Sequence, residues 1–323
     1  MNKKYLIAID IGGTKVHYGL FNNKFKILND SKRPIKSTRN IFKDFTCIVN
    51  DLKSFLNKLS IKTTEIRCIG VCVPSVIDSE TDTIIWTPNL KNWKNFNVRN
   101  FFDKEIGIPA FLSYDGHAAV LGEYSIHYKK EVKNMIFISI GTGIGSGLIL
   151  DGKLFLGSHN LAGAIGWFIN DKNEVIKDKI SVLGWLESKV SGKYLTGLVE
   201  RGFSNDISKG RKILPTEFFE LYKYKEENRK IKFIVEEMLD YLGMAISNIA
   251  TLLDLDLVVI GGGVGSKMGF ALDYLKRIVI RNSQPYITKD LKIRLSKTKN
   301  ASLVGAVINA VEKADYKNCK ILR

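Results

Sequence analysis

The sequence predicts an α/β fold, because strand-like apolar runs alternate with segments of helical spacing. The strand-like runs are rich in valine and isoleucine and read YLIAIDI, KVHYGLF, RCIGVCV, NMIFISI, GSGLILDG and LDLVVIGG. Between them, IFKDFTCIVNDLKSFLNKL and FIVEEMLDYLGMAISNIATLLD space their apolar residues as amphipathic helices do. A chain of 323 residues that is 45% hydrophobic has ample apolar material for large cores.

The chain begins with a strand, a glycine-rich turn and a second strand, and YLIAIDIGGTKVHYGLFNN leaves no room for a helix between them. The stretch NMIFISIGTGIGSGLILDGKLF repeats the same scheme further along. This repeated arrangement predicts two halves of related build that face one cleft.

The first turn, DIGGTK, has the spacing of neither a P-loop nor a dinucleotide-binding loop. Gly12 and Gly13 allow the backbone to approach a ligand closely. Thr14 offers a hydroxyl, Lys15 offers a cation, and Asp10 is placed to hold a hydrated Mg²⁺. An ordinary hairpin turn would need neither the aspartate nor the lysine, so the turn predicts a phosphate site.

Two further glycine-rich turns follow along the chain. The turn IGTGIGSGL can present several backbone N–H groups to phosphate oxygens, from Gly141, Thr142 and Gly143. The turn VVIGGGVGS lies between an apolar strand and the helix-like MGFALDYLKR, and adenine could lie against its glycines Gly261, Gly262 and Gly263. Taken alone, each of these turns could also be an ordinary turn between two secondary-structure elements, with no ligand.

Together and in this order, the three turns resemble the phosphate-1, phosphate-2 and adenosine segments of the actin-like ATPase superfamily. The stretches IGVCVPSVID, PNL and YDGHAAVLGE, with ASLVGAVINAV near the end, resemble its ROK branch (repressor, open reading frame, kinase). The resemblance implies a two-domain actin-like (ribonuclease H-like) fold with a central cleft. The expected domains are 1–118 with 303–323, and 119–302. The resemblance to the ROK branch also implies transfer of the γ-phosphate of Mg-ATP to a sugar hydroxyl.

Asp115, in SYDGHAA, occupies the position of the family's catalytic base. A sugar hydroxyl is a poor nucleophile unless a carboxylate accepts its proton as the new O–P bond forms. From the residues alone, Asp115 also fits a helix N-cap, and it could serve both purposes. His117 and His127 lack a second histidine or cysteine at ligand spacing, so we expect neither to bind metal.

The expected acceptor pocket departs from the family pattern. Where the family has GxAGEIGH, this chain has NLAGAIGW, so Ala164 replaces the glutamate and Trp167 replaces the histidine. The stretch that corresponds to the family's CxCGxxGCxE zinc segment has no cysteine, although Gly184 and Glu187 fit its end, so no zinc is expected. Tyr114 replaces an asparagine and Ser75 a glycine. The expected pocket comprises Ser75, Asn89, Tyr114, Asp115, Ala164, Trp167 and Glu187.

These replacements make glucose in the usual pose a poor fit, because buried hydroxyls without partners cost roughly 1–3 kcal/mol each. Trp167 and Tyr114 offer flat faces with a polar tip, which suit a modified, amino or deoxy sugar or a cyclitol. The alternative is that Trp167 merely fills the space of the missing zinc segment.

Three hypotheses for the function remain open. The leading hypothesis is an ATP-dependent kinase of a sugar or sugar-like polyol. A second is a non-catalytic sensor, although the chain starts at its first strand, so we expect no N-terminal helix-turn-helix. A third is a kinase that uses polyphosphate, which only the net charge of +16 supports.

Composition bounds the partners and the compartment. Lysines are spread along the whole chain, so we expect no nucleic-acid partner. No run of 18 apolar residues exists, and MNKKYLIAIDIGG is better interpreted as a buried strand than as a signal peptide. We therefore expect a cytoplasmic protein, with a homodimer possible. The four cysteines include no CxxC pair and are expected to be reduced.

Overall fold

The computed structural model of the chain describes residues 3–35, 37–87, 90, 92–174, 184–198, 214–222 and 229–321. It divides into two compact units. Unit 1 comprises Met1–Lys130, Leu154–Ala162 and Thr298–Arg323, and unit 2 comprises Glu131–Lys153 and Gly163–Lys297. The domain limits expected from the sequence, 1–118 with 303–323 and 119–302, remain a prediction.

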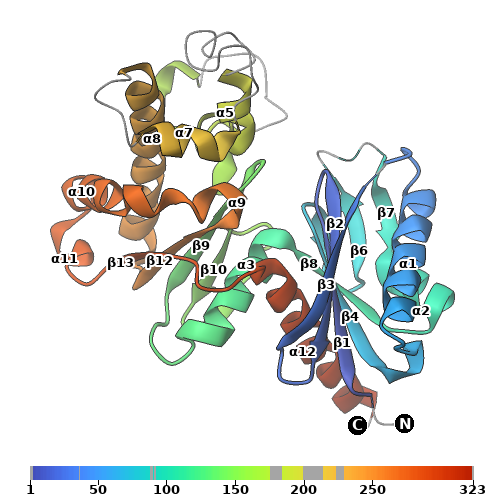
Figure 1. The fold of residues 1–323 in the computed structure, drawn as a ribbon. Coiled ribbons are helices and arrows are strands. Elements are labelled where there is room, and N and C mark those ends of the chain that lie inside the picture. Colours follow the sequence, from blue (N-terminus) through green and yellow to red (C-terminus); the bar gives the residue numbers. More distant parts are fainter. Residues whose placement is uncertain are drawn as a thin grey trace. The chain divides into compact units, whose positions relative to one another are not determined.

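Unit 1 is built on a five-stranded sheet of order β3-β2-β1-β4-β8 (Figure 1). The first three strands are antiparallel neighbours, whereas β1, β4 and β8 run parallel. A three-stranded sheet, β5-β6-β7, lies in the same unit. The strands are β1 (Tyr5–Ile11), β2 (Lys15–Asn22), β3 (Ile27–Pro34), β4 (Ile66–Val73), β5 (Val76–Asp78), β6 (Thr83–Trp86), β7 (Lys94–Asn97) and β8 (Ala110–Tyr114).

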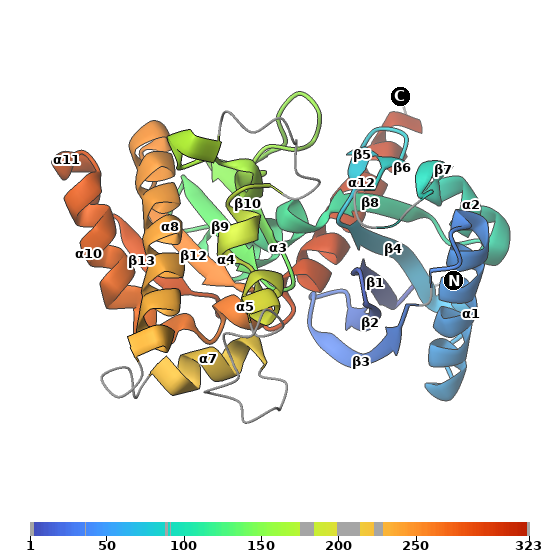
Figure 2. The ribbon, with the colours of Figure 1, turned by 90° about the horizontal axis from the view of Figure 1, so that it is seen from above.

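Helices cover both faces of the unit 1 sheet. Successive residues of β1 point to opposite faces, and those on both faces are mostly apolar, so each face needs a covering layer. Ile7 and Ile9 pack in the core cluster that includes side chains of α1 (Ile41–Lys58) and α2 (Val98–Ile106). Leu6 and Ala8 pack in the second cluster, with α3 (Asp115–Glu123) and α12 (Ala301–Ile321). Figure 2 shows the sheet between α12 and the α1–α2 pair.

The second five-stranded sheet has the order β11-β10-β9-β12-β13, and its strands β9, β10, β12 and β13 lie in unit 2. β9 and β10 are antiparallel, and β9, β12 and β13 are parallel. The strands are β9 (Met135–Ile140), β10 (Ile144–Leu150), β11 (Lys153–Phe155), β12 (Leu257–Gly261) and β13 (Lys292–Leu295). The helices are α4 (Glu187–Val190), α5 (Gly192–Leu198), α7 (Pro215–Tyr222), α8 (Arg229–Leu253), α9 (Gly262–Gly265), α10 (Leu272–Asn282) and α11 (Pro285–Thr288).

The two large sheets have the same strand order, a hairpin followed by parallel strands on its far side. This confirms the α/β class and the two halves of related build. Short helical turns complete the chain: the 3₁₀ turns η1 (Thr63–Glu65), η3 (Ile165–Trp167), η4 (Lys172–Glu174) and η6 (Met268–Ala271), and the π-helical turn η2 (Tyr124–Tyr128). Among the residues that the structure describes, no helix is both long and apolar enough to cross a membrane.

Candidate active site

The β1–β2 turn carries the first predicted phosphate site. The Gly12 N–H donates to the Lys15 carbonyl oxygen at 2.9 Å, which closes a tight turn. Gly13, Thr14 and Lys15 are exposed, and a Cβ at Gly13 would meet no atom within 4 Å. The tip of the turn is therefore open to a ligand that approaches the backbone.

Asp10, at the end of β1, is held by a residue far away in the sequence. The Ser302 hydroxyl, in the first turn of α12, donates to Asp10 Oδ2 at 2.7 Å. This bond restricts the orientation of the carboxylate. Local sequence patterns do not predict this bond, because 292 positions separate the two residues.

The strand register brings Asp10 and Asp115 to the same edge of the unit 1 sheet. Asp10 on β1 lies beside Cys72 on β4, and Cys72 lies beside Ser113 on β8, two residues before Asp115. The Cys72 thiol is fully buried. Burial raises the pKa of Cys72, and the carboxylates of Asp10 and Asp115 raise this pKa further. Both carboxylates therefore lie near one thiol, at the carboxyl ends of parallel strands, where ligands bind in open α/β sheets.

Asp115 begins helix α3 as its first residue. The N-cap is Tyr114, whose backbone is extended and whose side chain makes no capping bond. Asp115 Oδ1 accepts the Gly116 N–H at 2.8 Å. The cap expected at Asp115 thus falls one residue earlier, because β8 continues through Tyr114.

The second glycine turn joins β9 to β10 in unit 2 and is secured by α5. The Gly141 N–H donates to the Gly143 carbonyl at 2.9 Å, whereas the Gly141 and Thr142 carbonyls accept from the N–H groups of Gly192 and Lys193 at 2.8 and 3.0 Å. A Cβ at Gly141 would meet nothing within 4 Å. This turn is fixed from one side and open at Gly141.

The third glycine turn lies next to the second. Gly261, the last residue of β12, pairs with Ser139 on β9. Gly262 has φ +84, and a Cβ there would lie 2.5 Å from the Ile140 carbonyl oxygen. At Gly263 a Cβ would meet nothing within 4 Å. The predicted adenosine segment thus follows β12 directly beside the predicted phosphate-2 segment.

Gly262→Ala is expected to destabilise the protein by roughly 1–3 kcal/mol, because alanine would both clash and require positive φ. Gly263→Ala is the matched control, one residue on, and should leave stability nearly unchanged. Urea unfolding of the two variants and the wild type tests this expectation. Equal midpoints for both variants would contradict it.

The expected acceptor residues of unit 1 lie around the start of α3. The Ser75 hydroxyl is buried and lies 2.6 Å from the Thr87 hydroxyl, with either atom as donor. Tyr114 is half-buried, and its ring meets the His117 ring edge to face at 5.1 Å. Asn89 lies outside the described residues.

The expected acceptor residues of unit 2 are Ala164, Trp167 and Glu187. Ala164 directly precedes η3, and Trp167 ends it with 51% of its surface exposed. Glu187 lies against the phosphate-2 turn, where its Oε2 accepts the Ile144 N–H at 3.4 Å. Burial raises the pKa of Glu187. A Cβ at Gly143 would approach the same carboxyl group to 3.1 Å, so glycine suits this position.

His117 holds a neighbouring segment of unit 1 in place. Its Nε2 lies 2.9 Å from the Ala162 carbonyl oxygen, so Nε2 carries the proton and donates. Burial lowers the pKa of His117 from 6.5, and the bond to Ala162 opposes this change. The folded protein therefore favours neutral His117.

This preference predicts a pH effect on stability. Below pH 6.5 the unfolded chain binds a proton that the folded chain resists, so stability is expected to fall as the pH drops through the lowered pKa. His117→Asn should weaken this dependence between about pH 7 and 5. Thermal unfolding against pH, with His127→Asn as control, measures it. Equal slopes for His117→Asn and wild type would contradict the interpretation.

The residues present fit Mg-ATP. In unit 1 the exposed Gly13, and in unit 2 the half-buried Gly141 and the exposed Gly263, are positions where a Cβ would meet no atom within 4 Å, so each turn has room for a ligand against its backbone. Asp10 supplies the carboxylate oxygen that Mg²⁺ prefers. Within the described residues, no three His, Cys, Asp or Glu side chains gather as a metal-binding group. The expected absence of zinc stays a prediction.

Comparison with known proteins gives matches over nearly the whole chain. The ROK family matches residues 6–313. A xylose repressor of Caldicellulosiruptor bescii is 25% identical over 316 residues, which cover 95% of this chain and 77% of the repressor. An N-acetylmannosamine kinase of Vibrio vulnificus is 26% identical over 315 residues, which cover 95% of this chain and 98% of the kinase.

Solved structures share the fold. A ROK family glucokinase from Streptomyces griseus, in complex with glucose and AMPPNP, aligns with a TM-score of 0.76 at 22% identity. The alignment covers 95% of this chain and 99% of the glucokinase. This likeness confirms the two-domain actin-like fold class that the three glycine turns predict.

Proposed function

Because the chain belongs to the ROK family, we propose that it is an ATP-dependent kinase that phosphorylates a hydroxyl of a sugar or sugar-like polyol. The observation that supports this most is the placement of Asp10 and Asp115 at the same edge of the unit 1 sheet, at the ends of β1 and β8. One carboxylate is suited to the phosphate end of a nucleotide and the other to an acceptor hydroxyl. A chain that only bound a ligand would need no second carboxylate there.

In this proposal Asp115 is the general base. Its carboxylate accepts the proton of the acceptor hydroxyl as the oxygen forms its bond to the γ-phosphorus, while the bond from that phosphorus to the β,γ-bridging oxygen breaks and ADP leaves. The Gly116 N–H holds Asp115 Oδ1, which limits the rotation of the carboxylate. A base fixed in this way loses little entropy when the acceptor arrives.

The remaining residues bind and orient the donor. The open turns at 12–15 and 141–143 present backbone N–H groups to phosphate oxygens, and 261–263 would accept the adenosine. Mg²⁺, when bound, neutralises phosphate charge, and Asp10 would hold it through water. Ser302 keeps the Asp10 carboxylate oriented for this role.

The acceptor is proposed to be a modified, amino or deoxy sugar or a cyclitol. Ala164 cannot hydrogen-bond a hydroxyl, and Trp167 offers a half-exposed ring on which a less polar face can stack. The N-acetylmannosamine kinase relative is consistent with acceptors that carry substituents.

The experiment that tests the proposal is ADP release from Mg-ATP in the presence of hexoses, hexosamines, N-acetyl sugars and cyclitols. ADP release that depends on one acceptor class supports the kinase and names its substrate. Polyphosphate in place of ATP tests the alternative donor, which the net charge of +16 favours. ATP binding without turnover on any acceptor contradicts the proposal.

A non-catalytic sugar sensor is the second candidate. The replacement of the family's Glu and His by Ala164 and Trp167 favours it, as does the similarity to a xylose repressor. Sugar binding that leaves ATP unconsumed would support the sensor. ADP release that rises with acceptor concentration would exclude it.

A further inference from the structure

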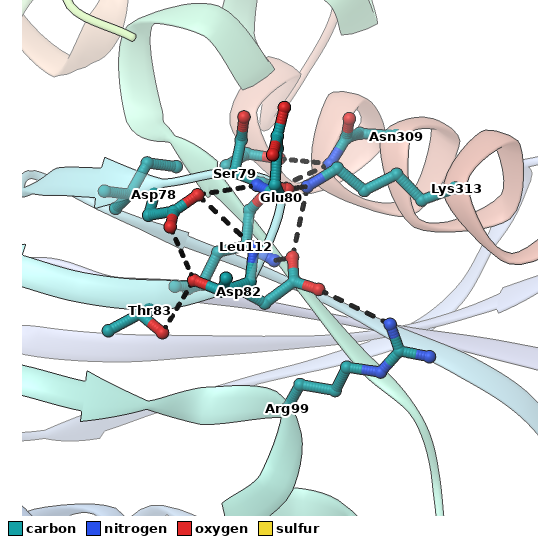
Figure 3. A network of polar contacts seen from close by, with 12 residues as sticks. Asp78, Ser79, Glu80, Asp82, Thr83, Arg99, Leu112, Asn309 and Lys313 are labelled. Carbon is teal, nitrogen blue, oxygen red and sulfur yellow. Dashed lines mark hydrogen bonds and ion pairs between the residues drawn. The ribbon is translucent and has the colours of Figure 1, made fainter. Parts of the chain in front are cut away.

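The outer edge of strand β8 is bonded by side chains instead of by another strand. β8 is the last strand in the order of its sheet, and among the described residues its strand partner is β4. At its middle, the Leu112 N–H donates to Asp82 Oδ1 at 3.0 Å. The Leu112 carbonyl accepts from Lys313 Nζ at 3.1 Å and from Asn309 Nδ2 at 3.2 Å. Figure 3 shows these groups converging on Leu112 from the β5–β6 turn and from α12.

Two features make an aspartate energetically unfavourable at position 82. Its side chain is fully buried, and its backbone has φ +57, which favours glycine. Burial raises the pKa of Asp82, and the neighbouring Lys313 opposes this rise. Lys313 Nζ lies 3.1 Å from Asp82 Oδ1, and Arg99 lies 3.9 Å from Oδ2. Glycine would form the same turn without burying a carboxylate or straining the backbone. We therefore expect the Asp82 carboxylate to have a role beyond forming the turn.

The role of Asp82 is indicated by the position of β8, which leads directly into Asp115. Asn309 also donates to the Ser113 hydroxyl at 2.8 Å, so two successive residues, Leu112 and Ser113, are held from outside the sheet. Asp115 follows directly after Tyr114. The three side chains thus fix the last part of the strand that leads into the proposed base.

We infer that Asp82, Asn309 and Lys313 form a clamp, the β8 clamp, that positions Asp115 for proton transfer. The three are positioning residues, because each acts through the backbone or side chain of β8. The catalytic part of this inference rests on the proposed function. The structural part, that the clamp immobilises residues 112–116, does not.

The β8 clamp acts on one side of the proposed reaction only. It contacts β8, whereas Asp10 and the 12–15 turn belong to β1 and its hairpin, two strands away in the sheet order. Loss of the clamp should therefore lower kcat and leave the KM for ATP nearly unchanged. A general loss of stability would not separate the two constants.

The test uses the full-length chain and two variants. Lys313→Met keeps the aliphatic stem but removes the donor to Leu112 and the partner of Asp82. Asp82→Asn combined with Lys313→Met removes both charges, which guards against misfolding caused by a single buried charge. Lys313→Arg is the conservative variant. Lys276→Met is the control, because Lys276 forms an exposed pair with Asp273 at 3.3 Å on α10.

Two readouts are measured below the unfolding temperature of every variant. Amide hydrogen exchange at residues 112–116 is expected to accelerate about tenfold or more in both clamp variants and to stay unchanged in Lys276→Met. With the acceptor found for the wild type, kcat should fall about 10- to 100-fold, with the KM for ATP within about twofold. Lys313→Arg should restore most of the slow amide exchange at residues 112–116 and most of the wild-type kcat.

The outcomes separate the clamp from the proposed function. Unchanged exchange at 112–116 in both clamp variants would overturn the inference, whatever the activity. Faster exchange with unchanged kcat would overturn the positioning role. If the wild type itself transfers no phosphate, the kinase proposal and the catalytic part fail together, and exchange alone decides whether the clamp holds β8.

Discussion

Asp115→Asn is expected to reduce acceptor-dependent ADP production by roughly 10²- to 10⁴-fold, the usual contribution of a positioned general base. Asparagine has nearly the same shape and still accepts the Gly116 N–H that now bonds Asp115 Oδ1 at 2.8 Å. It cannot take a proton from a hydroxyl at neutral pH. The variant should therefore fold, bind nucleotide and fail in the chemical step.

The measurement is kcat and the KM for ATP by a coupled ADP assay, together with nucleotide affinity by calorimetry. Asp273→Asn is the matched control, because that carboxylate is 83% exposed on α10. Unchanged nucleotide affinity with a collapsed kcat is the expected pattern. A kcat for Asp115→Asn that equals the control would remove Asp115 from the mechanism.

Gly305→Ala is expected to have the largest effect on folding. Gly305 lies where α12 crosses α3, and a Cβ there would overlap the Ala118 carbonyl and lie 2.8 Å from the Gly122 nitrogen. Both obstacles are backbone atoms, so the two helices must separate. The cost is about 3 kcal/mol or more, against a gain of about 1 kcal/mol in helix propensity.

Such a loss is a large share of a typical stability of roughly 5–15 kcal/mol. The measurement is the thermal midpoint and the yield of folded protein. Gly269→Ala serves as control, because a Cβ there would meet only Leu295 Cδ1 at an ordinary 3.5 Å. A Gly305→Ala variant as stable as this control would show that α3 and α12 do not pack as closely as described.

One face of α12 connects these observations. Ser302 bonds Asp10, Gly305 meets the helix that begins with Asp115, and Asn309 and Lys313 bond the strand before Asp115. Their spacing of three or four residues places them along one side of the helix. The same helix therefore supports both carboxylates of the proposed site, Asp10 and Asp115.

The sequence predicted the elements with strong hydrophobic patterns. The runs YLIAIDI, RCIGVCV, NMIFISI and LDLVVIGG lie in the central strands β1, β4, β9 and β12, and the two long helical patterns lie in α1 and α8. It did not identify β3, which is exposed and polar over ILNDSKRP, or the short strands β5 to β7. Edge and short strands lack the apolar run on which such a prediction depends.

Only the part of the candidate site that depends on local sequence patterns could be predicted. Glycine turns and an aspartate in a family pattern are local features, so Asp10 and Asp115 could be proposed from the residues. The contacts of Ser302, Cys72 and Asp82 depend on strand register and on a helix that arrives at the end of the chain. Polar residues at Ser302, Asn309 and Lys313 on one helical face were the available signal.

The central claim is that this chain transfers a phosphoryl group to the hydroxyl of a sugar-like acceptor. The most direct measurement is ³¹P NMR of each acceptor after incubation with Mg-ATP and the wild type or Asp115→Asn. A new phosphomonoester signal on one acceptor class with the wild type, and none with Asp115→Asn, is the predicted result. Bound ATP with no phosphorylated product across the whole panel would contradict the account.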